Sequence, residues 1–151
     1  MKVTLLLADA AQAVNGKLYI LGGGWSITNP TTDPFAIALK IDVPWSETNR
    51  RHTLVLELID EDGKPAMLPT PTGESPLRIE SVFEVGRPPG LKQGTSLDVP
   101  LAVNFAPLPL KPNTTYVWKC TIDGASKDDW RLTFTTRAAD PRQTPHGPQA
   151  G

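Results

Sequence analysis

In Phe35-Ala36-Ile37-Ala38-Leu39-Lys40-Ile41, large apolar side chains alternate with small or polar ones. Successive side chains of a β-strand point to opposite sides, so this period of two gives a strand one apolar face to bury. Together with four further alternating stretches, it predicts an all-β protein built from stacked antiparallel sheets. The four stretches are Leu54/Leu56/Leu58, Ile79/Ser81/Phe83/Val85, Val99/Leu101/Val103/Phe105 and Tyr116/Trp118/Cys120/Ile122.

The chain has 151 residues, which is enough for one domain with its own hydrophobic core. Its 16 prolines and 12 glycines are typical of short strands joined by many turns. We predict a single antiparallel β-sandwich of about eight strands within residues 1–137. Residues 138–151 contain no large apolar side chain, so we expect a disordered tail there.

Turn signals place several of the connections. Asn15-Gly16 predicts a two-residue hairpin between the strands Val3–Val14 and Lys17–Leu21. The acidic segment Asp60–Lys64 predicts a second turn, because it lacks both the alternating ligands and the helix of a calcium-binding EF-hand. Met67–Pro76 contains several prolines and is therefore expected to be a long loop or an irregular edge segment.

A corner-like segment precedes the penultimate predicted strand. It reads Leu108-Pro109-Leu110-Lys111-Pro112-Asn113-Thr114-Thr115-Tyr116. A leucine, a proline-containing turn and a tyrosine in this order resemble the tyrosine corner of immunoglobulin-like and fibronectin type III-like sandwiches. The resemblance implies that the Tyr116 hydroxyl bonds a backbone group near Leu110 to Pro112. Antibody-type domains have two cysteines around a tryptophan, and here Cys120 stands alone.

The first half of the chain carries a second resemblance. It rests on the segment Ala8–Gly23, on Pro34-Phe35, and on His52-Thr53-Leu54 with the acidic turn that follows. These features resemble an uncharacterised family of small bacterial proteins. The resemblance implies a β-sandwich fold and a bacterial protein, and it carries over no functional residue.

Charge and hydropathy exclude several classes of partner. The formal net charge is −1, and no run of five or six like charges is present, so neither nucleic acid nor a membrane surface is favoured. Asp9 and Gln12 interrupt the apolar N-terminal run, which argues against a signal peptide. No segment approaches the ~18 apolar residues of a membrane span. We therefore expect a cytoplasmic protein or a component of a phage particle.

The side chains available for catalysis are few. Cys120 lies on an alternating strand and is expected to be a small buried hydrophobe. His146 lies in the predicted tail, and His52, beside Arg50 and Arg51, is expected at a solvated strand edge. One cysteine and one ordered histidine cannot supply three protein ligands for a metal unless carboxylates complete the set, so no metal or cofactor is predicted. Surface turns explain the carboxylates of a conceivable hydrolase site, Asp60, Glu61, Asp62 and Glu74.

Two tryptophans are the candidate binding residues. Trp25 and Trp45 each follow a strand in a loop rich in glycine, proline or polar residues, whereas Trp118 and Trp130 are assigned to the core. An exposed tryptophan can stack on a sugar ring or insert into a protein partner. The alternative is that Trp25 and Trp45 only cap the open ends of the sandwich.

Three functions follow from these observations. The leading hypothesis is a non-enzymatic sandwich that binds another protein or assembles with itself, such as an accessory or decoration component of a bacterial or phage assembly. The second is a carbohydrate-binding module that uses Trp25 or Trp45, with Asn29 and Asn49 as weak polar neighbours. The third is a small hydrolase using surface carboxylates. The sequence leaves the partner and the oligomeric state open.

Overall fold

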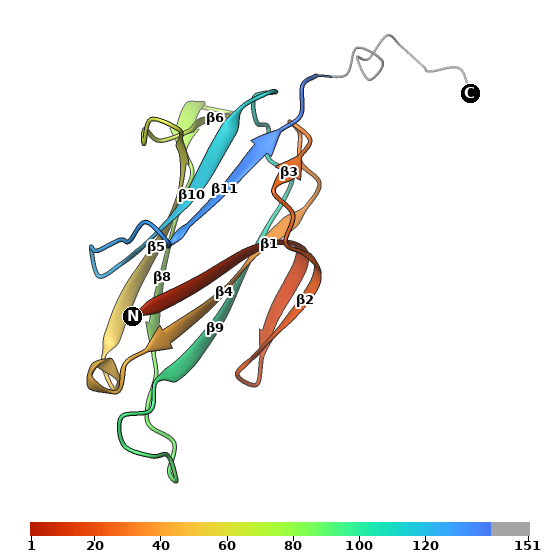
Figure 1. Cartoon of the computed structure of the whole chain (residues 1–151). Coiled ribbons are helices and arrows are strands. Elements are labelled where there is room, and N and C mark those ends of the chain that lie inside the picture. The colour runs from red at the N-terminus through yellow and green to blue at the C-terminus, as the bar shows by residue number, and fades with distance from the viewer. Residues whose placement is uncertain (140–151) are drawn as a thin grey trace.

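The computed structural model describes residues 1–139, which form an all-β fold (Figure 1). Within these residues, no helix is long and apolar enough to cross a membrane. The strands are β1 (Lys2–Val14), β2 (Lys17–Gly23), β3 (Ile27–Thr28), β4 (Phe35–Val43), β5 (Arg51–Asp60), β6 (Met67–Thr70), β7 (Gly73–Pro76), β8 (Arg78–Glu84), β9 (Leu97–Phe105), β10 (Thr115–Ile122) and β11 (Arg131–Thr136), and a short 3₁₀ helix, η1, spans Trp45–Glu47.

Two sheets face each other across the core. One has the strand order β2-β1-β4-β9 and the other the order β3-β11-β10-β5-β8, while β6 and β7 form a separate two-stranded ribbon. Neighbouring strands are antiparallel, except that β3 runs parallel to β11. Strands β4 and β9 lie opposite β5, β10 and β11, as the corresponding strands do in immunoglobulin-like domains. The predicted immunoglobulin-like sandwich is confirmed.

The alternation seen in the sequence fills the space between the sheets. Phe35, Ile37, Leu39 and Ile41 of β4 point inwards and are buried against residues of the opposite sheet. Trp118 at the centre of β10 is completely enclosed. Each large apolar side chain buried in this way contributes about 1.5–3 kcal/mol of stability. Trp130 and Phe134 are buried as well, which confirms the expected place of Trp130 in the core.

The tyrosine corner is also present. The Tyr116 side chain is buried, and its hydroxyl accepts a hydrogen bond of 2.9 Å from the backbone N–H of Lys111. This is the backbone segment that the resemblance implied. Asn113 has a φ of 51°, a left-handed conformation that asparagine tolerates better than most residues, and it turns the chain towards β10. The corner therefore ties the β9–β10 connection to the core.

The first hairpin folds against the outside of the sandwich. Asn15 and Gly16 have φ values of 50° and 73°, as a two-residue hairpin turn of type I′ requires. Ala36 and Ala38 of β4 point away from the main core, yet both are buried. Ala11 and Leu18 of the hairpin pack over them, together with Leu6 and Ala102. The small alanine side chains leave the space that the hairpin occupies.

Two local expectations need correction. Met67–Pro76 is a regular two-stranded antiparallel ribbon rather than a long loop or an irregular edge segment. Each strand of a two-stranded ribbon has an open side, so Pro69 can sit in β6 without interrupting a sheet. The two residues of β3 were not expected, because so short a segment carries no periodic signal. The tail expected from residue 138 lies outside the described residues from residue 140 onwards.

Candidate functional site

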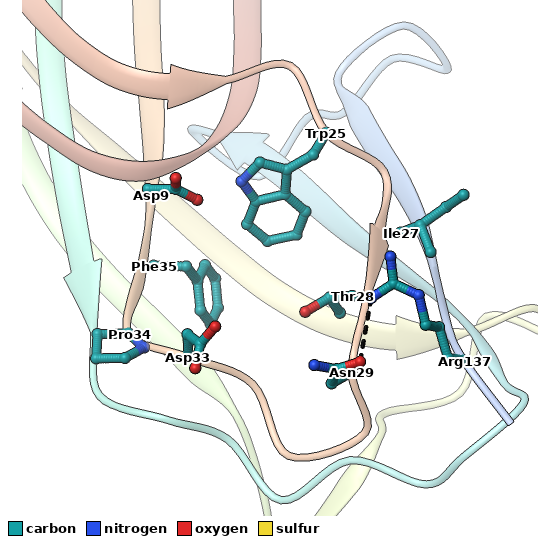
Figure 2. A pocket seen from close by; sticks show the side chains of 9 residues that line it. All are labelled: Asp9, Trp25, Ile27, Thr28, Asn29, Asp33, Pro34, Phe35 and Arg137. Atoms are coloured by element: carbon teal, nitrogen blue, oxygen red, sulfur yellow. Dashed lines mark hydrogen bonds between the residues drawn. The ribbon is translucent and has the colours of Figure 1, made fainter. Parts of the chain in front are cut away.

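Trp25 lies in the loop between β2 and β3 and lines a small cavity of about 160 Å³. Figure 2 shows its indole nitrogen on the side of Asp9, with Asn29 and Asp33 around the rest of the opening. Arg137, which follows β11, donates a hydrogen bond of 3.1 Å to the side-chain oxygen of Asn29. The cavity thus joins two aromatic rings, those of Trp25 and Phe35, to charged and amide side chains, a set that can bind the hydroxyl groups of a small polar ligand.

Trp25 also has a structural role. Its ring meets Phe35 edge-on with the ring centres 6.0 Å apart, and Phe35 stacks on Phe105 at 4.8 Å. The side chain is half-buried, and its Nε1 is enclosed without a hydrogen-bond partner among residues 1–139. Because the ring continues the aromatic packing of the core, Trp25 caps one end of the sandwich. Its predicted role in binding stays a prediction.

Trp45 lies at the opposite end of β4 from Trp25. It begins η1, two residues after β4 ends, whereas Trp25 contacts Phe35 at the start of that strand. The Arg87 guanidinium lies over the Trp45 ring, 4.2 Å from its centre, and donates a hydrogen bond of 2.7 Å to the Thr48 hydroxyl. One ring face is therefore covered by a cation, so Trp45 is the weaker candidate for stacking on a sugar.

His52 is not at a solvated edge, and this expectation was wrong. Its side chain is only 1% exposed and stacks on Phe83. Nδ1 lies 2.6 Å from a carboxylate oxygen of Asp123, and Nε2 lies 2.8 Å from the carbonyl oxygen of Glu47. Both partners are acceptors, so the fully bonded ring carries two protons. His52 thereby links η1 to the turn after β10.

His52 and Asp123 shift each other's pKa. Burial lowers the pKa of His52, but the hydrogen bonds to Asp123 and Glu47 and the Asp123 charge outweigh it, so the net pKa is raised. The hydrogen bond from His52 lowers the pKa of Asp123, with further help from the Thr53 backbone N–H. A histidine whose two nitrogens are both occupied has no free base to offer to a nucleophile.

The acidic residues and the cysteine have structural explanations. One carboxylate oxygen of Asp60 accepts hydrogen bonds from the backbone N–H groups of Asp62 and Lys64, which closes the predicted turn. Asp60 and Glu74 do line one cavity, of about 330 Å³. Burial raises the pKa of Cys120 to about 11, so its thiol stays protonated. In the part of the chain that the structure describes, no three His, Cys, Asp or Glu side chains gather as a metal site.

The surface that sequence reasoning missed lies on the first hairpin. Tyr19 and Leu21 of β2 are 56% and 71% exposed, and Val14 is exposed on the same face of the hairpin, whereas Ile20 points to the opposite face. Tyr19 pairs with Gln12 and Leu21 with Ala10, so the outward face of the hairpin is mostly apolar. The available signal was the run of apolar residues from Leu18 to Leu21, which lacks the polar alternation of a strand with one solvated face.

Fold and surface together define an immunoglobulin-like β-sandwich that carries an apolar hairpin on its outer face. The chain matches DUF6941, a family of unknown function, over residues 3–135, and it belongs to that family. The match extends the resemblance seen in the first half of the chain as far as β11. No curated protein matches the chain.

Proposed function

We propose that this protein is a non-enzymatic interaction or assembly domain, and that the hairpin formed by β1 and β2 is its contact surface. The observation that carries the proposal is the exposure of Tyr19 and Leu21 on the face of the hairpin that also carries Val14. An exposed group of apolar side chains on one face marks a site of protein contact. The aromatic ring of Tyr19 is of the kind enriched at such contacts.

The chemistry elsewhere in the molecule supports a binding role over a catalytic one. Both nitrogens of His52 are engaged, and the Cys120 thiol is buried and protonated, so neither serves as base or nucleophile. The net charge of −1 favours a protein partner over nucleic acid. An accessory or decoration role in a bacterial or phage assembly is the setting that such a compact sandwich suits, by analogy of fold alone.

Site-directed photo-crosslinking tests the proposal. A photoreactive phenylalanine analogue placed at Leu21 is expected to give a crosslinked product in cells that make the protein. The matched control carries the same analogue at Val82 of β8, a residue 49% exposed on the other sheet. Products from the Leu21 position alone support the hairpin as a contact surface. Equal products from both positions, or none, would reject it.

The Trp25 cavity favours carbohydrate binding as the second candidate function. Asp9, Asn29 and Asp33 surround this tryptophan, which gives the ring the polar neighbours that a sugar site needs. Specific hits on a glycan array that disappear in Asp33→Ala would support it. Asp33 is exposed, so its loss should leave the melting temperature unchanged, whereas Trp25→Ala would also remove packing on Phe35.

A further inference from the structure

The strands at the sheet ends differ in how they prevent further pairing. Unpaired backbone groups at a sheet edge can bind another strand, and natural edges are blocked by charges, proline or shortness. Strand β3 has only two residues, and β9 contains Pro100 together with Asp98. Strand β8 carries charges along its length, at Arg78, Glu80 and Glu84.

Strand β2 is the exception. It reads Lys17-Leu18-Tyr19-Ile20-Leu21-Gly22-Gly23, with one charge at its first residue and no proline. Within residues 1–139 it pairs only with β1, and Figure 1 shows it at the margin of its sheet. Every second residue of such a strand directs its N–H and C=O away from the neighbouring strand. A row of unpaired backbone N–H and C=O groups of β2 therefore lies beside the apolar face of the hairpin.

We propose that β2 pairs antiparallel with β2 of a second copy of this chain about a two-fold axis. This inference rests on the proposed function and names its partner. Pairing of this kind would join two four-stranded sheets into one continuous sheet. A two-fold contact needs a surface that is compatible with itself, and β2 meets this condition because its single charge lies at one end.

The register follows from the length and the charge of the strand. Full overlap of β2 with its copy places Ile20 opposite Ile20, and each Tyr19 opposite Leu21 of the other chain. Both Tyr19–Leu21 pairs then lie on the outward face, where aromatic and aliphatic side chains stabilise cross-strand contacts. Each Lys17 lies opposite Gly23. A shift that places Tyr19 opposite Tyr19 would instead set Lys17 against the apolar Leu21.

The backbone of Gly22 limits how far this ladder extends. Gly22 has a φ of 59°, a left-handed conformation that ends the regular part of the strand, and its Cα packs beside the Asp9 side chain. The central residues Tyr19, Ile20 and Leu21 therefore carry the contact. Their side chains are the ones already exposed on the isolated domain.

Sedimentation velocity over a concentration series tests the pairing on the full chain. We expect a species of twice the 16.4 kDa chain mass that dissociates on dilution. Leu21→Lys should weaken the dimer at least about tenfold, because it places a charge within the apolar contact. Val82→Lys, at a comparably exposed apolar residue of β8, should leave the dissociation constant unchanged. Thermal unfolding of each variant confirms that it folds.

A charge-swap mixture tests the register. Tyr19→Glu and Leu21→Lys chains should each be weaker dimers alone, yet pair with one another, because residues 19 and 21 face each other across the axis. A wild-type chain that is monomeric at about 100 μM overturns the pairing, as does a mixture that fails to pair. A monomer that still crosslinks from position 21 to a different protein overturns this inference alone. A monomer with no such crosslink overturns the proposed function too.

Discussion

Strands β10 and β2 are both rich in apolar side chains, yet those of β10 are buried and those of β2 are mostly exposed. Strand β10 lies between β5 and β11, and every second residue from Tyr116 to Ile122 is buried. Strand β2 has a neighbour on one side only, and most of its apolar side chains are exposed. The alternating strand matches its surroundings, whereas the continuously apolar one has the composition of a strand covered on both faces.

Removing the Tyr116 side chain should have the largest effect on stability, because Tyr116 belongs to the enclosed strand β10. Tyr116→Ala leaves a cavity and should lower the free energy of unfolding by about 3–5 kcal/mol. Tyr116→Phe removes only the acceptor of the Lys111 N–H and should cost about 1–3 kcal/mol. Denaturant unfolding measures both values. A Phe variant as stable as the parent would mean that water replaces the hydroxyl.

A larger side chain in place of a buried alanine of β4, Ala36 or Ala38, should loosen the contact between the hairpin and the sandwich. Ala38→Leu adds volume between β4 and the hairpin at a fully packed position, and should cost about 1–3 kcal/mol. The matched control is Ala13→Leu, at an exposed position of the same hairpin, which should stay within about 0.5 kcal/mol. Hydrogen exchange would show the difference as faster exchange in β2 alone. Uniformly faster exchange would contradict a separate outer layer.

The pH dependence of stability should show the His52–Asp123 pair. Because the pKa of His52 is raised in the folded protein, its contribution is present below the unfolded value of about 6.5 and is lost as pH rises through the folded pKa. The lowered pKa of Asp123 gives stability above its unfolded value, which is lost as pH falls through the folded one. The contribution of the pair to the free energy of unfolding is therefore largest between about pH 4 and 6.5.

Denaturant midpoints between about pH 5.5 and 8.5 measure this effect, which should be smaller than the first two because Asp123 is 47% exposed. His52→Gln should flatten the decline in stability above neutral pH. His146→Gln is the matched control and should preserve the decline. The same slope in both variants would show that another group titrates.

Deleting residues 138–151 should have the smallest effect. The segment has no large apolar side chain, so the melting temperature of the shortened chain is expected within about 2 °C of the parent. Differential scanning calorimetry of the two chains makes the comparison. A larger decrease would show that the segment packs on the sandwich.

Alternating apolar residues and turn-forming residues were sufficient to predict most of the fold. The strand with Phe35, the Asn15-Gly16 hairpin and the corner at Tyr116 all follow from local patterns, and the structure has them where the sequence placed them. The ribbon at Met67–Pro76 was missed because the prolines that argue against a central strand are tolerated in a two-stranded one.

The functional surface was harder to predict, because it depends on contacts distant in sequence. His52 and Asp123 are separated by 71 positions, and nothing in the pattern around Arg50 and Arg51 indicates that the imidazole is enclosed. The exposure of Tyr19 and Leu21 depends on the hairpin folding over the alanines of β4. Periodicity identifies β2 as a strand, but does not show which of its faces is covered.

The enclosure of Cys120 provides an intrinsic kinetic reporter. The chain contains one cysteine, its side chain is inaccessible, and burial raises the pKa of the thiol to about 11. A thiol reagent can therefore modify it only after β10 has opened, so the rate of labelling follows the opening of the main core. Because β2 belongs to the other sheet, opening of the hairpin alone does not expose the Cys120 thiol to the reagent. Labelling can thus time core opening separately from motion at the first hairpin.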